Sequence, residues 1–262
     1  MSKFCANLAF MYTERPFLER YKLAKESGFK AVESGFPSGF TQQQVVDAKN
    51  AAGIDQILIN LFTGDVTKGE LGVTAIPGKE NEFKERFQTT LSYAKALGAK
   101  KIHIMAGKVE GPVTEDNDRT YENNLKFAAG LLELQDIIGV IEPINKYSVP
   151  NYYLNCYDKA LSMVNKVNSP NIKIMLDVFH LQHIRGDITN TVKDLKEFIG
   201  HVQIAQCPNR NEPNTPGEIN YRYILEMLRE NGYNDWIGLE YKPKTSVNEG
   251  LKWVNEFGYR LY

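Results

Sequence analysis

The chain has 262 residues, of which 42% are hydrophobic and 24% are charged, and this length suits a single domain spanning residues 1–262. The net charge of -1, from 31 basic and 32 acidic residues, argues against a nucleic-acid or membrane partner. No apolar run approaches the ~18 residues that a membrane span needs. We see no signal peptide, and three unpaired cysteines fit reduced thiols, so we expect a cytoplasmic protein.

Short aliphatic stretches alternate with stretches of helical periodicity along the whole chain. In chain order, the predicted strands are residues 4–8, 31–34, 56–60, 101–105, 139–143, 172–177, 201–206 and 237–241. Five predicted helices end at a glycine directly before a strand, in the stretches ESGF, AAGI, ALGA, FIGH and ENGY. The last helix begins with SVNE at Ser246, which is a capping-box pattern. This rhythm predicts parallel strands joined by crossover helices.

Eight strands and eight helices in this length predict a single-domain (β/α)8 TIM barrel of the α/β class. The alternative is an open doubly wound sheet, which usually carries a glycine-rich fingerprint after its first strand. The residues in that place, ANLAFMYTERP, contain no GxGxxG, so the barrel is favoured. Two long connections, residues 61–80 and 207–220, are interpreted as lids or binding loops.

Polar side chains end six of the eight predicted strands, and in a TIM barrel the chemistry lies at the carboxyl ends of the strands. These residues are Glu33, Asn60, Glu142, Asp177 with His180 after it, Gln203 with Gln206 beyond it, and Glu240 followed by Lys242. Each alone has a purely structural interpretation, because a single carboxylate at a strand end is most often solvated or paired with a lysine.

Glu142, Asp177, Gln203 and Glu240 come from four successive strands and should converge at the mouth of the barrel. Three converging carboxylates repel one another, and a divalent cation would remove that repulsion. Because the ligands are all oxygen atoms, Mg²⁺ or Mn²⁺ is favoured over zinc. As a set, these residues therefore predict a metal site.

The chain resembles the hydroxypyruvate isomerase family, within the xylose-isomerase-like barrels, over nearly its whole length. The matching stretches include IEPIN (141–145), LDVFHLQ (176–182), HVQIAQCPNRNEP (201–213), PGEINY (216–221) and GLEYKP (238–243). The resemblance implies metal ligands at the same four positions, Glu142, Asp177, Gln203 and Glu240. It also implies that Glu142 and Glu240 are the acid/base pair.

The reaction implied by this resemblance converts hydroxypyruvate into 2-hydroxy-3-oxopropanoate (tartronate semialdehyde) through an enediolate. A metal would act as Lewis acid and template while one glutamate removes a proton from C3 and the other returns one to C2. We expect His180 to bind a substrate hydroxyl and Arg210 to bind the substrate carboxylate. The remaining candidates for substrate binding are Lys242, Glu33 and Asn60.

Other functions share this fold. A related isomerase or 3-epimerase could act on a larger 2-oxo acid, such as 2-oxo-tetronate, or on a ketose. A DNA-repair endonuclease would need a histidine-rich multi-zinc site and a basic groove, which four histidines and a net charge of -1 argue against. A non-catalytic barrel would lack a ligand or one glutamate, and none is missing. The sequence does not indicate which of Glu142 and Glu240 is the base and which is the acid, and it specifies no oligomeric state.

Overall fold

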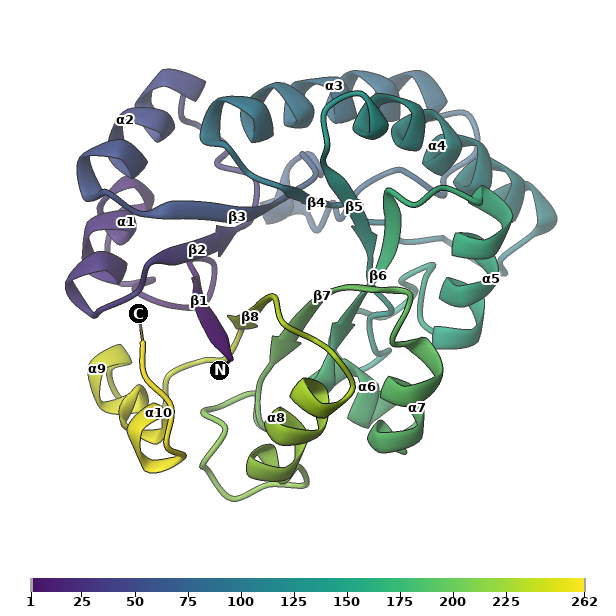
Figure 1. The fold of residues 1–262 in the computed structure, drawn as a ribbon. Coiled ribbons are helices and arrows are strands. Elements are labelled where there is room, and N and C mark those ends of the chain that lie inside the picture. The colour runs from purple at the N-terminus through teal and green to yellow at the C-terminus, as the bar shows by residue number, and fades with distance from the viewer. Residues whose placement is uncertain (1, 262) are drawn as a thin grey trace.

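The computed structural model describes residues 2–261 and contains a closed barrel of parallel strands. The strands follow one another around the barrel in chain order, and β8 closes it by pairing with β1 (Figure 1). They are β1 (Lys3–Asn7), β2 (Ala31–Ser34), β3 (Asp55–Asn60), β4 (Lys101–His103), β5 (Ile138–Ile141), β6 (Ile172–Asp177), β7 (Ile199–Ile204) and β8 (Trp236–Leu239). The prediction of a (β/α)8 barrel is confirmed, with all eight strands displaced by no more than a few residues.

Helices surround the barrel and cover the outer face of its strands (Figure 1). They are α1 (Phe17–Glu26), α2 (Gln42–Ala52), the 3-10 helix η1 (Val66–Lys68), α3 (Glu80–Leu97), α4 (Glu115–Glu133), α5 (Tyr157–Val167), α6 (Val178–Ile184), α7 (Ile188–Leu195), α8 (Tyr221–Glu230), α9 (Val247–Gly250) and α10 (Lys252–Glu256). Their apolar faces pack on the strands and form the main core. Within residues 2–261, no helix is long and apolar enough to cross a bilayer.

Four of the five glycines predicted to end helices follow their helices with positive φ: Gly28, Gly53, Gly98 and Gly232. The prediction for Gly200 is wrong, because α7 already ends at Leu195 and Gly200 lies inside β7. A Cβ atom at Gly200 would lie 2.6 Å from the Cβ of Lys173 on β6. Close contact between neighbouring strands, and not helix termination, therefore explains this glycine.

The interior of the barrel is unusually polar. Residues two apart on a strand share a face, and on β1, β4 and β7 such pairs are polar: Cys5 and Asn7, Lys101 and His103, His201 and Gln203. All six are buried. A small apolar cluster of Leu58, Val140 and Met175 is separate from the main core. Polar side chains therefore continue inward from the mouth of the barrel toward its amino-terminal end.

The long connection after β7 is held by Gln206. Its side-chain amide donates to the carbonyl oxygens of Pro213 and Ile219, at 3.2 and 2.9 Å, and its oxygen accepts from the backbone N–H of Cys207 and of Ile219. A Cβ atom at Gly217 would lie 2.3 Å from the carbonyl oxygen of Cys207. The PGEINY stretch thus needs its glycine so that the loop can close over Gln206.

Candidate active site

The four predicted metal ligands lie at the carboxyl ends of β5 to β8. Glu142 and Glu240 directly follow β5 and β8, Asp177 ends β6, and Gln203 is the penultimate residue of β7. The strand register places Gln203 beside Asp177 on one side and beside Gly238 on the other. The parallel strands thus gather these side chains at one part of the barrel mouth.

His180, in the first turns of α6, faces two of these carboxylates. Its Nε2 lies 3.5 Å from Asp177 Oδ2 and 3.8 Å from Glu142 Oε1. Its Nδ1 accepts from Asn145, from the backbone N–H at 3.2 Å and from the side-chain amide at 2.7 Å. The orientation of that amide is fixed because its oxygen accepts from the backbone N–H of Tyr147 and Ser148.

These contacts determine the protonation state of His180. Because both Asn145 groups only donate, Nδ1 is an acceptor and the ring proton is on Nε2, which faces the carboxylates. Burial and the nearby Arg210 charge hold the pKa of His180 well below its usual range. His180 is therefore a neutral hydrogen-bond donor into the site.

Arg210 enters the site from the loop after β7. Its guanidinium lies 3.2 Å from Asp177 Oδ2 and donates to Glu240 Oε2, and it contacts the rings of Phe10 and Phe179, whose centroids are each 4.7 Å away. In this structure the arginine thus neutralises part of the carboxylate charge. Its binding to a substrate carboxylate stays a prediction.

One arginine does not compensate three carboxylates, of which Glu142 and Asp177 are buried and Glu240 is half-buried. Burial, with Asp177 adding to it and Arg210 opposing it, raises the pKa of Glu240 to about 8. Burial and the charges of Glu240 and Asp177 raise the pKa of Glu142 well above its usual range, and burial also raises that of Asp177. Without a further cation, the site holds protons that ordinary carboxylates release.

The donor atoms fit a hard divalent cation. Glu142 Oε1 and Gln203 Oε1 are buried, and among residues 2–261 neither has a hydrogen-bond partner. A buried acceptor without a donor costs about 1–3 kcal/mol, so an occupant that supplies positive charge would stabilise both. Both atoms belong to the predicted ligand set, and carboxylate and amide oxygens suit Mg²⁺ or Mn²⁺.

The other predicted substrate-binding residues lie in different surroundings. Asn60, at the end of β3, is half-buried, and its amide contacts the sulfur of Met105 at 3.9 Å. The Lys242 side chain is exposed, and its backbone N–H donates to the carbonyl oxygen of Arg210 at 2.7 Å. Substrate contacts of Asn60 and Lys242 stay predictions.

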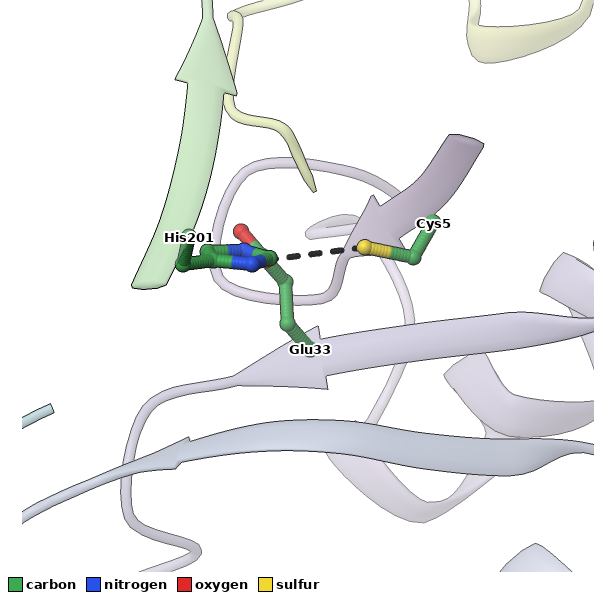
Figure 2. Close-up of side chains that lie close together, drawn as sticks. All are labelled: Cys5, Glu33 and His201. Carbon is green, nitrogen blue, oxygen red and sulfur yellow. Dashed lines mark hydrogen bonds and ion pairs between the residues drawn. The ribbon is translucent and has the colours of Figure 1, made fainter. Parts of the chain in front are cut away.

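Glu33 lies deeper than the other predicted residues and is fully buried. Its Oε1 accepts from the amides of Asn7 and Gln203, at 2.7 and 2.6 Å, and its Oε2 accepts from His201 at 2.6 Å. Figure 2 shows this carboxylate between the imidazole of His201 and the sulfur of Cys5, which is 3.5 Å from Oε2. Burial opposes the charge of Glu33, but the interaction with His201 and the hydrogen bonds from Gln203 and Asn7 outweigh it and lower the pKa of Glu33.

The contacts continue on both sides of Glu33. Toward the mouth, Asn7 also donates to Glu240 at 3.1 Å. Toward the amino-terminal end, His201 Nδ1 lies 3.0 Å from the Lys101 ammonium, which pairs with Asp235 at 2.7 Å. We call this connected set the polar column: Asp235, Lys101, His201, Glu33, Asn7 and Gln203. Asn7, Lys101 and His201 are absent from the predicted site, although the two-residue period of β1, β4 and β7 indicates that they face the interior.

Comparison with known proteins identifies relatives of the whole chain. The family model described as xylose isomerase-like TIM barrel matches residues 21–257. The chain is 44% identical to the putative hydroxypyruvate isomerase of Drosophila melanogaster, covering 99% of both chains. It is 38% identical to the hydroxypyruvate isomerase of Escherichia coli K12, covering 98% of this chain and 100% of that one.

Two further matches widen the range of printed names. The 2-oxo-tetronate isomerase of Cupriavidus necator is 38% identical, with 98% of this chain and 99% of that one covered. A crystal structure described as an AP endonuclease, family 2, from Brucella melitensis superposes with a TM-score of 0.94 at 37% identity, covering 98% of this chain and 99% of the other. Together with the barrel and its site, these matches place the chain in the hydroxypyruvate isomerase family of the xylose isomerase-like TIM barrels.

Proposed function

We propose that this isomerase interconverts hydroxypyruvate and 2-hydroxy-3-oxopropanoate. The observation that carries the proposal is the position of Glu142 and Glu240, two carboxylates that follow β5 and β8 at one candidate metal site. The relatives named hydroxypyruvate isomerase support this choice of substrate.

The reaction moves a proton between neighbouring carbons. In this proposal one of the two glutamates removes the proton from C3 and the other returns one to C2. His180 donates from Nε2 to the substrate oxygen on which negative charge develops. Glu142, Asp177, Gln203 and Glu240 would hold a Mg²⁺ or Mn²⁺ ion, which would supply Lewis-acid stabilisation and a template for the substrate oxygens.

Arg210 would bind the carboxylate of the substrate. The planar guanidinium can form two parallel hydrogen bonds with a carboxylate, and the rings of Phe10 and Phe179 pack against it. The ion pairs with Asp177 and Glu240 show that the side chain reaches the carboxylate cluster. An incoming oxo acid would then be oriented with its carboxylate at Arg210 and its reacting carbons near the two glutamates.

The test is turnover of the purified protein on a panel of substrates. The protein is stripped with a chelator and then assayed with hydroxypyruvate, 2-oxo-tetronate and neutral C5 and C6 ketoses, with and without added Mg²⁺ or Mn²⁺. We expect the highest kcat/KM on hydroxypyruvate and a loss of activity on stripping that either ion restores. Turnover of ketoses without turnover of hydroxypyruvate would contradict the proposed substrate.

A second candidate is isomerisation of 2-oxo-tetronate. The relative of that name is as similar to this chain as the Escherichia coli hydroxypyruvate isomerase, with 38% identity in both cases. The acid/base pair and the candidate metal site would serve this substrate equally, since only the pocket for the longer carbon chain differs. A higher kcat/KM on 2-oxo-tetronate in the same panel would select this activity.

A further inference from the structure

The amide of Gln203 has two ends, and only its oxygen can bind a cation. Rotating the amide by half a turn would instead place its N–H groups where its oxygen now lies. Gln203 Nε2 donates to Glu33 Oε1 at 2.6 Å, and this leaves Gln203 Oε1 buried and without a hydrogen-bond partner in the described part of the chain. The contact with Glu33 thus selects the end of the amide that the candidate metal site needs.

The orientation depends on Glu33 being an acceptor at both oxygens. The amides of Asn7 and Gln203 can only donate to Oε1. At Oε2 the partner is His201 Nε2, and an imidazole nitrogen either donates or accepts according to the tautomer. Glu33 therefore accepts at both oxygens only in the tautomer of His201 that carries its proton on Nε2.

Lys101 fixes that tautomer from the amino-terminal side of the barrel. An ammonium group has donors only, so His201 Nδ1, 3.0 Å from Lys101 Nζ, must accept. The ring proton then lies on Nε2 and is donated to Glu33. Lys101 is itself held by Asp235 at 2.7 Å. Each contact of the polar column thus determines the direction of the next.

We propose that Glu33 is a positioning residue that holds the Gln203 amide with its oxygen toward the metal site, and that Lys101 and His201 hold Glu33 in the accepting state. The proposal rests on the proposed function, because it assigns Gln203 as a metal ligand. It gives Glu33 a role behind the site, without direct contact with substrate. Gly238 makes room for it, since a Cβ atom there would lie 2.4 Å from both Glu33 carboxylate oxygens.

The first test replaces Glu33 by glutamine. Glu33→Gln keeps the shape but introduces an amide that can donate to Gln203, so the Gln203 amide can turn over. We expect the affinity of the metal-free protein for Mn²⁺, measured by calorimetry and by electron paramagnetic resonance, to fall roughly 10- to 100-fold, the usual effect of removing such a partner. The matched control is Cys5→Ser, which changes another buried neighbour of the same carboxylate and should leave Mn²⁺ affinity unchanged within about twofold, well short of that effect.

A reciprocal exchange separates positioning from general damage to the fold. In the double variant Glu33→Gln/Gln203→Glu, the carboxylate introduced at position 203 can offer an oxygen to the cation whichever way it is turned. The amide introduced at position 33 can donate to the other oxygen of that carboxylate. We expect most of the lost Mn²⁺ affinity to return. A double variant that binds Mn²⁺ more weakly than Glu33→Gln alone would overturn the proposal.

The distant end of the column gives an independent test. Lys101→Met changes none of the proposed metal ligands, but it removes the ammonium group that fixes the tautomer of His201. Nitrogen-15 NMR of the four histidines should show His201 protonated at Nε2 in the natural protein and as a mixture of tautomers in the variant, with weaker Mn²⁺ binding. If Glu33→Gln does not fold, this variant decides the question.

The possible outcomes separate this proposal from the proposed function. Natural protein that binds Mn²⁺ and isomerises hydroxypyruvate, with unchanged Mn²⁺ affinity in Glu33→Gln and Lys101→Met, would overturn the positioning role alone. Natural protein that binds no Mn²⁺ would overturn the metal role of Gln203, and with it this proposal.

Discussion

Glu142 and Glu240 are the residues on which the proposed chemistry depends. Glu142→Gln and Glu240→Gln keep the size and a ligand oxygen but remove the titrating group. We expect isomerisation to fall by roughly 10²-fold or more in each, the usual scale for a lost acid or base. Because the two groups act as a unit, the double variant should be little worse than the worse single variant.

Deuterium exchange would distinguish the two glutamates. In deuterated water, one of the single variants should still exchange the C3 proton of the substrate without forming product, because deprotonation survives and delivery to C2 does not. The variants should melt like the natural protein and bind the cation. Near-normal isomerisation in both would show that these glutamates are not the catalytic pair.

Arg210 offers a second prediction for a single residue. Arg210→Lys keeps the charge but loses the planar fork and its packing against Phe10 and Phe179. We therefore expect KM for hydroxypyruvate to rise, while any neutral ketose that the enzyme accepts is affected less. An equal loss on both substrates would show that Arg210 mainly holds the carboxylate cluster together.

The sequence predicts which side chains lie at the mouth of the barrel well where a polar residue ends a strand, and less well where it does not. Asp177, Gln203 and the glutamates stand out because apolar runs end at or near them. Lys101 and His201 were missed because they begin or interrupt their strands, and only the closed barrel shows that they face Glu33. Contacts across the interior depend on register between distant strands, which no local pattern specifies.

Among the elements of the fold, the loop after β7 carries both Gln206, whose side chain holds the loop closed, and Arg210, which enters the site. Gly217→Ala would place a methyl group 2.3 Å from the carbonyl oxygen of Cys207, so the loop must move. We expect kcat/KM to fall by roughly 10-fold or more, since a displacement of about 1 Å at a site can cost about 10²-fold. The control is Gly130→Ala on α4, where the added methyl meets nothing within 4 Å and should stabilise the helix slightly. Unchanged kinetics in Gly217→Ala would show that the loop tolerates the shift.

The strands themselves were predicted almost completely, because short aliphatic runs between stretches of helical periodicity nearly always form strands. The error at Gly200 shows the limit of such reasoning: FIGH has the pattern of a helix end, but Lys173 on the neighbouring strand is what excludes a side chain. A glycine that follows a helix can therefore either end that helix or make room for a neighbouring strand. At Gly200 only the packing between β6 and β7 distinguishes these two roles.

For the whole molecule, stability should depend on pH in a particular direction. The folded pKa of Glu240 is about 8, above the ordinary value near 4.5, so the folded state binds more protons between these values. The free energy of unfolding of metal-free protein should therefore fall as pH rises, by about 1 kcal/mol per unit just below pH 8. The buried histidines, whose pKa values are lowered, act in the opposite direction, but mainly below about pH 7, so they reduce the fall between pH 7 and pH 8 without reversing it.

The measurement is urea unfolding of the metal-free protein at pH 7 and pH 8. Saturating Mn²⁺ should abolish the loss, because the cation binds the ionised carboxylates and displaces their protons. Glu240→Gln should show a weaker dependence without metal. Stability that rises between pH 7 and pH 8 in metal-free protein would mean that these carboxylates ionise readily without a cation.

The polar column implies a conflict between heat resistance and catalysis. Replacing buried ionic groups by well-packed aliphatic side chains often raises stability by about 1–4 kcal/mol. A library that varies the buried residues Lys101 and His201 and is selected only for survival of heating should therefore become enriched in aliphatic residues at these two positions. The same clones should bind Mn²⁺ weakly and turn over slowly, because in the proposed arrangement they would no longer hold Glu33, and through it the Gln203 ligand, in place.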